Sequence, residues 1–329
     1  MARRLVWPAA VLATAAAVVL SLAIGTRAVP PAAVLDALLR GTTSPDALVV
    51  RSLRLPRTEV GLTAGAALGL SGATLQAVTR NPLADPGILG LSQGAAAGVV
   101  IAISLGLAHG FAGYVWYAFA GAVAAACLVY AIAARGRGGA SPVKLALAGT
   151  ALSAMTAGAT TVVLTSSSAT LDQFRFWQVG AVSGRDADSV VRMLPFLAAG
   201  LVLVLLCARG LDALALGDET ARALGHRVRL VRGAAALGAA LLTAAAVAAA
   251  GPVAFVGLAV PHLARRLTRN APHRVLLPLS ALLGAALLLA ADVAGRVVRA
   301  PAEVPAGVMT ALVGAPVLVA LVRKKGATA

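Results

Sequence analysis

Long apolar runs separated by short polar segments dominate the pattern of this 329-residue chain. A membrane-spanning helix needs roughly 20 mostly apolar residues. The runs lack the alternation of polar and apolar residues that barrel strands require, so the pattern predicts an all-α fold. Spans are expected at residues 5–25, 58–79, 88–108, 113–134, 143–166, 191–209, 229–250, 252–267, 275–295 and 304–322. These make about ten transmembrane helices in one domain, residues 1–329.

Composition and charge support this fold class. With 60% hydrophobic and only 12% charged residues, the chain has more apolar surface than a soluble fold can bury. The net charge of +16 could indicate nucleic-acid binding. When the ten-span path starts inside the cell, however, 18 of the 28 basic residues fall on its inner face, as the positive-inside rule expects. We therefore expect both termini in the cytoplasm and no nucleic-acid partner.

The first span has two interpretations. It follows Arg3 and Arg4, as the apolar part of a signal peptide does, but its apolar run is longer than the usual 7–15 residues and no small-residue cleavage site follows. An uncleaved first helix is therefore favoured. Cys127 and Cys207 lie in separate apolar segments and predict neither a disulfide nor a metal site.

Two segments combine apolar residues with helix breakers. Residues 80–94 contain two prolines and three glycines, and residues 251–262 contain Pro252 and Pro261. Non-helical backbone at this depth must be covered by protein or line a water-filled space. The first segment is therefore either part of a pathway or a tight turn in which Asp85 or Ser92 caps a helix.

Residues 211–225 lie on the predicted inner side and are too polar to span. They predict two short helices, with Gly217 between them, Asp218 capping the second and Gly225 ending it. The segment also carries apolar side chains that another molecule could cover: Leu214, Leu216 and Leu224. The cover is either a protein or the inner leaflet, but anionic lipid would repel the acidic residues here.

The outer loop at about 26–57 holds a short helical piece, 32–39, and ends in a basic cluster of Arg51, Arg54 and Arg57. Such a cluster at a helix end is often an interfacial anchor. On the outer face it runs against the charge bias, so an acidic protein partner is an equal alternative.

The sequence contains no recognisable source of energy for transport. Its lysines, Lys144, Lys324 and Lys325, do not occur in a phosphate-binding G-x-x-x-x-G-K-[ST] loop. The histidines at 109, 226, 262 and 273 form no ligand or catalytic spacing. We therefore expect neither an enzyme nor a bound cofactor or metal.

Two rival functions remain open. An ion-driven carrier would use buried carboxylates, for which Asp292 and Glu303 come closest. A membrane scaffold without transport activity would have a sealed interior. If the chain does transport, its energy is expected to come from a partner.

Four segments, taken in order, resemble the FecCD-type permeases, the ABC importer family for iron-siderophores, haem and cobalamin. The segments are RLPR, GAALGLSGA with Gln76, and NPLADPG at 54–87; FRFWQVGAVSGR at 174–185; ALGDETARALG at 215–225; and GPVAFVGLAVPHLAR at 251–265. The resemblance implies a type II ABC importer permease in a bacterial cytoplasmic (inner) membrane. It also implies a homodimer, two cytoplasmic subunits that bind ATP and Mg, and an extracytoplasmic substrate-binding protein.

The resemblance also assigns roles to residues. It implies that 210–228 form the coupling helices that seat in the ATPase, with Gly217, Asp218, Glu219, Ala221, Leu224 and Gly225 as the contact element. Arg54, Arg57 and Arg296 match arginines that pair with glutamates of the binding protein. Ser141, Pro142 and Val143 occupy the gate position.

The gate segment departs from the hydroxyl pair of cobalamin members, which makes cobalamin a weaker expectation. Segment 174–185 is more similar to siderophore permeases. A ferric siderophore is therefore the expected substrate class, and haem is the alternative.

Overall fold

The computed structural model describes residues 2–25, 29–40, 44–107, 110–135, 141–185, 187–269 and 271–326, and every regular element in these ranges is helical. The ten predicted spans correspond to α1 (Ala2–Ala23), α4 (Leu55–Thr79), α5 (Leu91–Ser104), α6 (Gly110–Ala134), α7 (Pro142–Ser166), α9 (Ala187–Leu206), α12 (Val228–Ala250), α13 (Val256–Thr268), α14 (His273–Val298) and α15 (Ala306–Gly326). Among the described residues, six helices are long and apolar enough to cross a membrane: α1, α6, α7, α9, α12 and α14.

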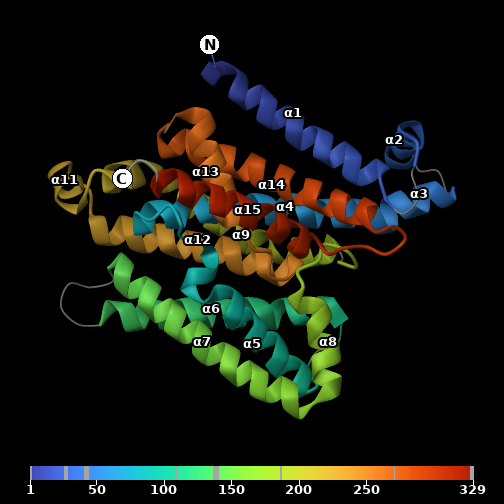
Figure 1. The fold of residues 1–329 in the computed structure, drawn as a ribbon, viewed down its shortest axis with the longest axis horizontal. Helices are drawn as coiled ribbons and strands as arrows, with labels where there is room; N and C mark the ends of the chain where they lie inside the picture. Colours follow the sequence, from blue (N-terminus) through green and yellow to red (C-terminus); the bar gives the residue numbers. More distant parts are fainter. Residues whose placement is uncertain are drawn as a thin grey trace.

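Shorter helices lie between the spans: α2 (Pro31–Leu39), α3 (Pro45–Val49), η1 (Val50–Arg54), η2 (Pro86–Leu89), α8 (Ser168–Gln178), α10 (Ala208–Ala215) and α11 (Asp218–Ala223). The helical piece expected at 32–39 is present as α2, whereas α8 was not expected from the sequence. Figure 1 places α11 at one end of the molecule and α2 and α3 at the other.

Helix α4 is the centre of the bundle and packs against α14, α12, α13 and α9. Its contact with α14 depends on small residues, because a Cβ added at Gly65 or Gly69 would collide with the backbone of Gly284 or Ser280. Glycines four residues apart allow two helices to approach closely in a membrane. The polar residues of α4 face protein rather than lipid, for example Ser71, which is fully buried and bonded to Thr243.

Two predicted spans differ from the structure in length. The eighth, expected at 252–267, contains only the 13-residue helix α13, which at 1.5 Å per residue rises about 20 Å. The backbone before it is non-helical, with Gly251 and Phe255 at positive φ. The third, expected at 88–108, contains the 14-residue α5 after the short η2. Pro86 and the left-handed Gly90 explain the shortening.

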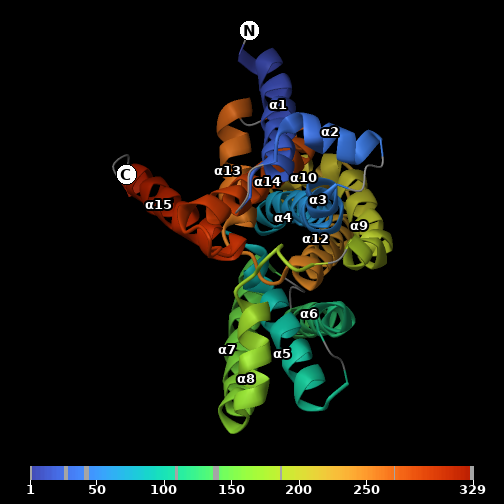
Figure 2. The ribbon, with the colours of Figure 1, turned by 90° about the vertical axis from the view of Figure 1, so that its right-hand side faces the viewer.

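The helices gather into two groups. Figures 1 and 2 show α5, α6, α7 and α8 on one side of the molecule, with α1, α13 and α14 on the opposite side. Figure 2 shows α15 projecting from the side of the molecule, between α13 above it and α7 below it. On α7 an apolar stripe remains exposed: Val143, Leu147, Met155 and Val162.

Candidate functional site

The inner element consists of α10 and α11, joined at Gly217. Gly217 has φ 109° and Gly225 has φ 83°, backbone conformations that L side chains rarely adopt. The two predicted short helices and the glycines that delimit them are therefore confirmed. Leu216 and Leu224 are 65% and 59% exposed, and Glu219 is exposed as well. The element thus projects an apolar and acidic surface from the end of the molecule (Figure 1).

Two details of this element differ from expectation. Leu214 is buried within the chain rather than offered to a partner, because α10 packs against α4, α12 and α14. Asp218 does not cap α11. The N-cap residue of α11 is Gly217, and no side chain makes a capping hydrogen bond at this end of the helix.

The Asp218 carboxylate instead holds α11 against two longer helices. It accepts hydrogen bonds from Arg80 Nη2 at 2.9 Å and from Arg232 Nη2 at 2.9 Å. Arg80 follows the last residue of α4, and Arg232 lies in the first turns of α12. Asp212 of α10 adds a contact with α14, accepting the His273 backbone N–H at 2.8 Å. The projecting element is therefore fixed to three long helices at its base.

The outer arginines lie in the interior of the chain. Arg54 Nη1 donates to the carbonyls of Leu22 and Ala23 at 2.8 and 2.7 Å. Arg296 Nη1 donates to the carbonyls of Ser21 and Ile24 at 2.7 and 2.9 Å. The last carbonyls of a helix lack partners within the helix, so two guanidinium groups complete the C-terminal end of α1. The charges also oppose the negative end of the helix dipole.

A buried carboxylate, Asp292, connects Arg296 with Arg57. Asp292 is 1% exposed and accepts from Arg57 Nη2 at 2.7 Å, from Arg57 Nε at 2.9 Å and from Arg296. Arg57 also pairs with Glu303 at 2.7 Å, and the Glu303 side chain is one-third exposed. This outer ion cluster, comprising Arg54, Arg57, Asp292, Arg296 and Glu303, joins α1, α4, α14 and the segment before α15.

Docking by Arg54, Arg57 and Arg296 stays a prediction. The structure brings the three arginines together at the expected end of the bundle. Arg54 and Arg296 are 5% and 1% exposed and bind groups of their own chain, whereas Arg57 is the most accessible of the three, with a 12% exposed side chain.

A cavity of about 520 Å³ lies where the two interrupted segments meet. Its wall comes from four parts of the chain: Asp85, Gly87, Ser92, Gln93 and Ala96; Gln178 and Val179; Pro252, Val253 and Ala254; and Gly307, Val308 and Ala311. Non-helical backbone at this depth therefore lines a cavity, as the physics of the bilayer requires. The capping interpretation of 80–94 is confirmed for Asp85, which caps η2 by accepting the Gly87 N–H at 2.8 Å. Asp85 also lines the cavity, and a role of this segment in a pathway stays a prediction.

The cavity is weakly charged. Asp85 is its single ionisable wall residue among those described. Burial raises the pKa of the Asp85 carboxyl, and the hydrogen bond from Gly87 partly opposes that shift. The wall thus offers amide, hydroxyl and backbone groups with little fixed charge.

Helix α8 is the part of this region that the apolar pattern missed. Ser167 caps it by accepting the Thr170 N–H at 3.2 Å, and the rings of Phe174 and Trp177 stack at 5.8 Å, fully buried. The Gly180 carbonyl then accepts the Gly307 N–H at 2.9 Å, which ties this segment to α15. The Ser-x-x-Thr start could have revealed the helix.

The predicted gate residues lie at the start of α7. Ser141 is the cap of α7 and accepts the Lys144 N–H at 3.4 Å, and Val143 is 68% exposed. The side chain of Pro142 lies outside the described part, as does His109. A gating role stays a prediction. No cluster of His, Cys, Asp or Glu that could hold a metal ion occurs among the described residues.

Residues 13–324 match the sequence model of the FecCD transport family. The chain belongs to this family. It is 43% identical to the Ferric enterobactin transport system permease protein FepD of Escherichia coli (strain K12), over 98% of this chain and 96% of that protein. It is 40% identical to the Probable siderophore transport system permease protein YfiZ of Bacillus subtilis (strain 168), over 84% of this chain and 83% of that protein.

A solved transporter structure shares the fold. An ABC transporter described as of the metal-chelate type, solved in an inward-facing conformation, matches with a TM-score of 0.83 and 30% identity, covering 98% of this chain and 99% of the other. Other FecCD relatives are named as permease proteins for haemin and for cobalamin. The type II permease architecture expected from the sequence is confirmed, and the protein is a multi-pass membrane protein of a family of ABC importer permeases.

Proposed function

We propose that the protein is the membrane permease of an ABC importer for a ferric siderophore. The supporting observation is its similarity, along nearly the whole chain, to the ferric enterobactin permease protein. The cavity of about 520 Å³ fits this role, because its amide and backbone groups let a bulky chelate pass without strong electrostatic binding. Haemin and cobalamin are the alternative substrates, since relatives carry those names.

The proposed transporter contains two copies of this chain. Among the six candidate spans of the described residues, α7 is the least buried, at 22%, and the exposed residues of α15 include Leu312 and Val313. The exposed apolar residues of α7 and α15 suit contact with a second copy of the chain. The proposed pathway then runs between the two copies. In this arrangement both termini and α11 face the cytoplasm of the inner membrane.

The energy comes from two separate subunits that bind ATP and Mg. Segment 210–228 is the proposed coupling element. Glu219 and Leu224 present the contact surface, Ala221 packs beneath it, and Gly217 and Gly225 set its shape. Asp218 passes the movement to α4 and α12 through Arg80 and Arg232. Closure of the ATPase pair then rearranges the two copies and opens the pathway on alternating sides.

At the outer face the proposed partner is an acidic surface of the binding protein. Arg57 is the proposed contact, because it retains an exposed part next to Glu303. Arg54 and Arg296 support this rim by holding α1 in place.

Uptake into proteoliposomes tests the function. The chain, its ATPase and its binding protein are reconstituted, and uptake of ferric enterobactin, haemin and cobalamin is measured with and without ATP. ATP-dependent uptake of the iron chelate alone supports the proposal, and preference for haemin or cobalamin overturns the substrate class. Gradient-driven uptake without the ATPase would overturn the importer mechanism.

The coupling element is tested by Glu219→Ala with Leu224→Ala. Both side chains are exposed, so the double variant is expected to assemble while losing most ATP-dependent uptake. Arg266→Gln, which also removes an exposed side chain at this end, is the matched control. Full uptake by the double variant would contradict the coupling role.

A further inference from the structure

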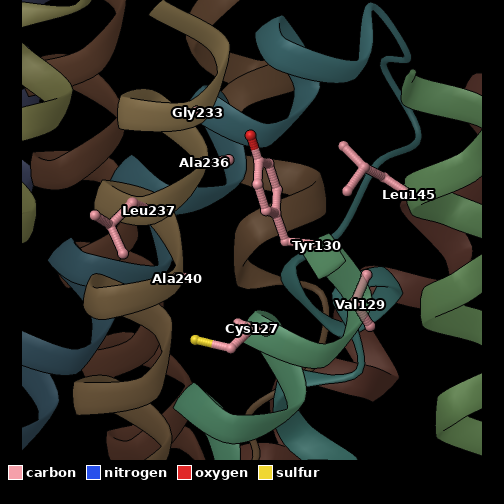
Figure 3. A pocket seen from close by; sticks show the side chains of 9 residues that line it. Cys127, Val129, Tyr130, Leu145, Gly233, Ala236, Leu237 and Ala240 are labelled. Atoms are coloured by element: carbon pink, nitrogen blue, oxygen red, sulfur yellow. The ribbon is translucent and has the colours of Figure 1, made fainter. Parts of the chain in front are cut away.

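A second cavity, of about 290 Å³, lies between α6, α7 and α12. Figure 3 shows Cys127 and Tyr130 of α6 facing Gly233 and Leu237 of α12, with Leu145 of α7 beside them. It shares no lining residue with the cavity at the interrupted helices. The second cavity is therefore separate from the proposed pathway.

This groove opens toward lipid. Tyr130 and Leu237 are 46% and 53% exposed, and α6, α7 and α12 are all candidate membrane spans. Along α12 the lining runs from Gly233 to Ala240, a distance of about 10 Å at 1.5 Å per residue. An elongated apolar groove on a membrane-facing surface fits a hydrocarbon chain better than a polar solute.

A basic residue lies near one end of the groove on each of the three helices: Arg135 directly after α6, Lys144 in α7 and Arg229 in α12. Arg229 lies four residues before Gly233 and therefore on the same face of α12. Lys144 directly precedes Leu145, and its Nζ lies 3.5 Å from the carbonyl oxygen of Arg135 at the end of α6. Toward the other end, residues 110–126 of α6 and 241–250 of α12 contain no charged residue.

Acidic residues do not balance these cations locally. The sequence has no Asp or Glu between 86 and 171, nor between 220 and 291. The acids nearest before α12 are Glu219, which belongs to the proposed ATPase contact, and Asp218, which already binds Arg80 and Arg232. The mouth of the groove therefore has an excess of positive charge that calls for an anion.

We propose that this groove binds one anionic phospholipid of the inner leaflet. An acyl chain lies between α6, α7 and α12, and the phosphate lies among Arg135, Lys144 and Arg229. Basic pockets between membrane helices bind anionic headgroups in this way. Tyr130 places a ring among the apolar groups and a hydroxyl toward Gly233 (Figure 3), as suits a residue at the membrane interface.

Native mass spectrometry of the purified full-length protein tests the proposal, with phosphatidylglycerol and phosphatidylcholine of identical acyl chains as probes. The parent should retain phosphatidylglycerol preferentially. Since each basic residue contributes roughly a fivefold effect on anionic-lipid binding, Lys144→Gln with Arg229→Gln should weaken retention about 25-fold. Arg266→Gln removes one exposed cation on α13, which packs against α4 and α14 and does not line the groove, and should retain the lipid normally.

A groove-filling variant separates a true site from general surface charge. A Cβ added at Gly233 meets only the Tyr130 hydroxyl, at 3.6 Å, and leucine favours helix more than glycine does. Gly233→Leu should therefore fold and lose retention of both lipids. Equal retention of the two lipids by the parent, equal loss in Arg266→Gln, or undiminished binding in Gly233→Leu would each overturn the proposal.

Discussion

Asp292→Asn tests the buried outer ion cluster. The substitution preserves the shape of the side chain but removes one of the two negative charges that pair with the Arg57 and Arg296 guanidinium groups. Asp292 is the only acceptor shared by Arg57 and Arg296 in the described contacts, and both it and Arg296 are 1% exposed. Breaking a buried ion pair by removing one partner costs about 3–5 kcal/mol, because the other charge stays buried without compensation.

The free energy of unfolding should therefore fall by about 3–5 kcal/mol, measured by denaturation with sodium dodecyl sulfate in mixed micelles. Glu303→Gln is the matched control, because it affects the same Arg57 but lies one-third exposed. Its loss should stay within about 1 kcal/mol, as for accessible pairs. Combining Asp292→Asn with Arg57→Gln should cost less than the sum of the single changes, because the two residues interact directly.

The same variant distinguishes the importer from an ion-driven carrier. In a carrier that used Asp292 to bind the coupling ion, Asp292→Asn would abolish transport while the free energy of unfolding stayed close to that of the parent. The structure instead predicts a loss of stability first. A stability change below about 0.5 kcal/mol, within the range of a neutral surface substitution, would refute the reasoning about the cluster.

Three further substitutions test other parts of the fold. Gly65→Val should prevent stable assembly, because a Cβ at Gly65 meets the backbone of Gly284 and Ala285. Gly158→Ala on α7 is the control and should be tolerated, because a Cβ there meets nothing within 4 Å. Size-exclusion chromatography of fluorescent fusions measures the assembly of both variants, and normal assembly of Gly65→Val would contradict the close α4–α14 contact. Gly217→Ala should cost about 1–3 kcal/mol locally, because φ 109° and ψ 158° lie in a region that is essentially restricted to glycine. It should reduce transport-coupled ATP hydrolysis more than thermal stability, and unchanged coupling would count against a fixed shape for the turn. Asp218→Asn should loosen α11 from Arg80 and Arg232 and raise amide hydrogen exchange in 217–225 without raising it in α14; protection equal to the parent would show that these bonds are dispensable.

The sequence predicted the elements that rest on local patterns. Apolar run length located the long helices, and Gly217 and Gly225 delimited the inner element, because both signals depend on the residues themselves. It overestimated the spans at 88–108 and 252–267, since hydropathy adds apolar residues across breaks that Pro86, Gly90 and Phe255 introduce. It missed α8, whose buried aromatic residues occur within a polar stretch.

The outer cluster could not be predicted as a set of contacts. Arg57 and Asp292 are 235 positions apart, and an arginine at a helix end has the same local sequence whether it faces water, a partner or the carbonyls of another helix. The resemblance to FecCD permeases singled out three arginines that lie together in the structure, but only the packing of α1 shows what Arg54 and Arg296 bind. Their hydrogen bonds to the carbonyls of Leu22, Ala23, Ser21 and Ile24 attach the end of α1 to the bundle.

Helix α4 determines how the two ends of the molecule are related. Arg57 in its first turn belongs to the outer ion cluster, and Arg80 at its C-terminal cap binds Asp218 of α11. Between them, Ser71 bonds to α12 and Gln76 bonds to the carbonyl of Gly257 in α13. A helix of 25 residues rises about 37 Å, so one well-packed element joins both proposed docking surfaces. A movement of α11 must therefore either carry α4 with it or break the bond between Asp218 and Arg80.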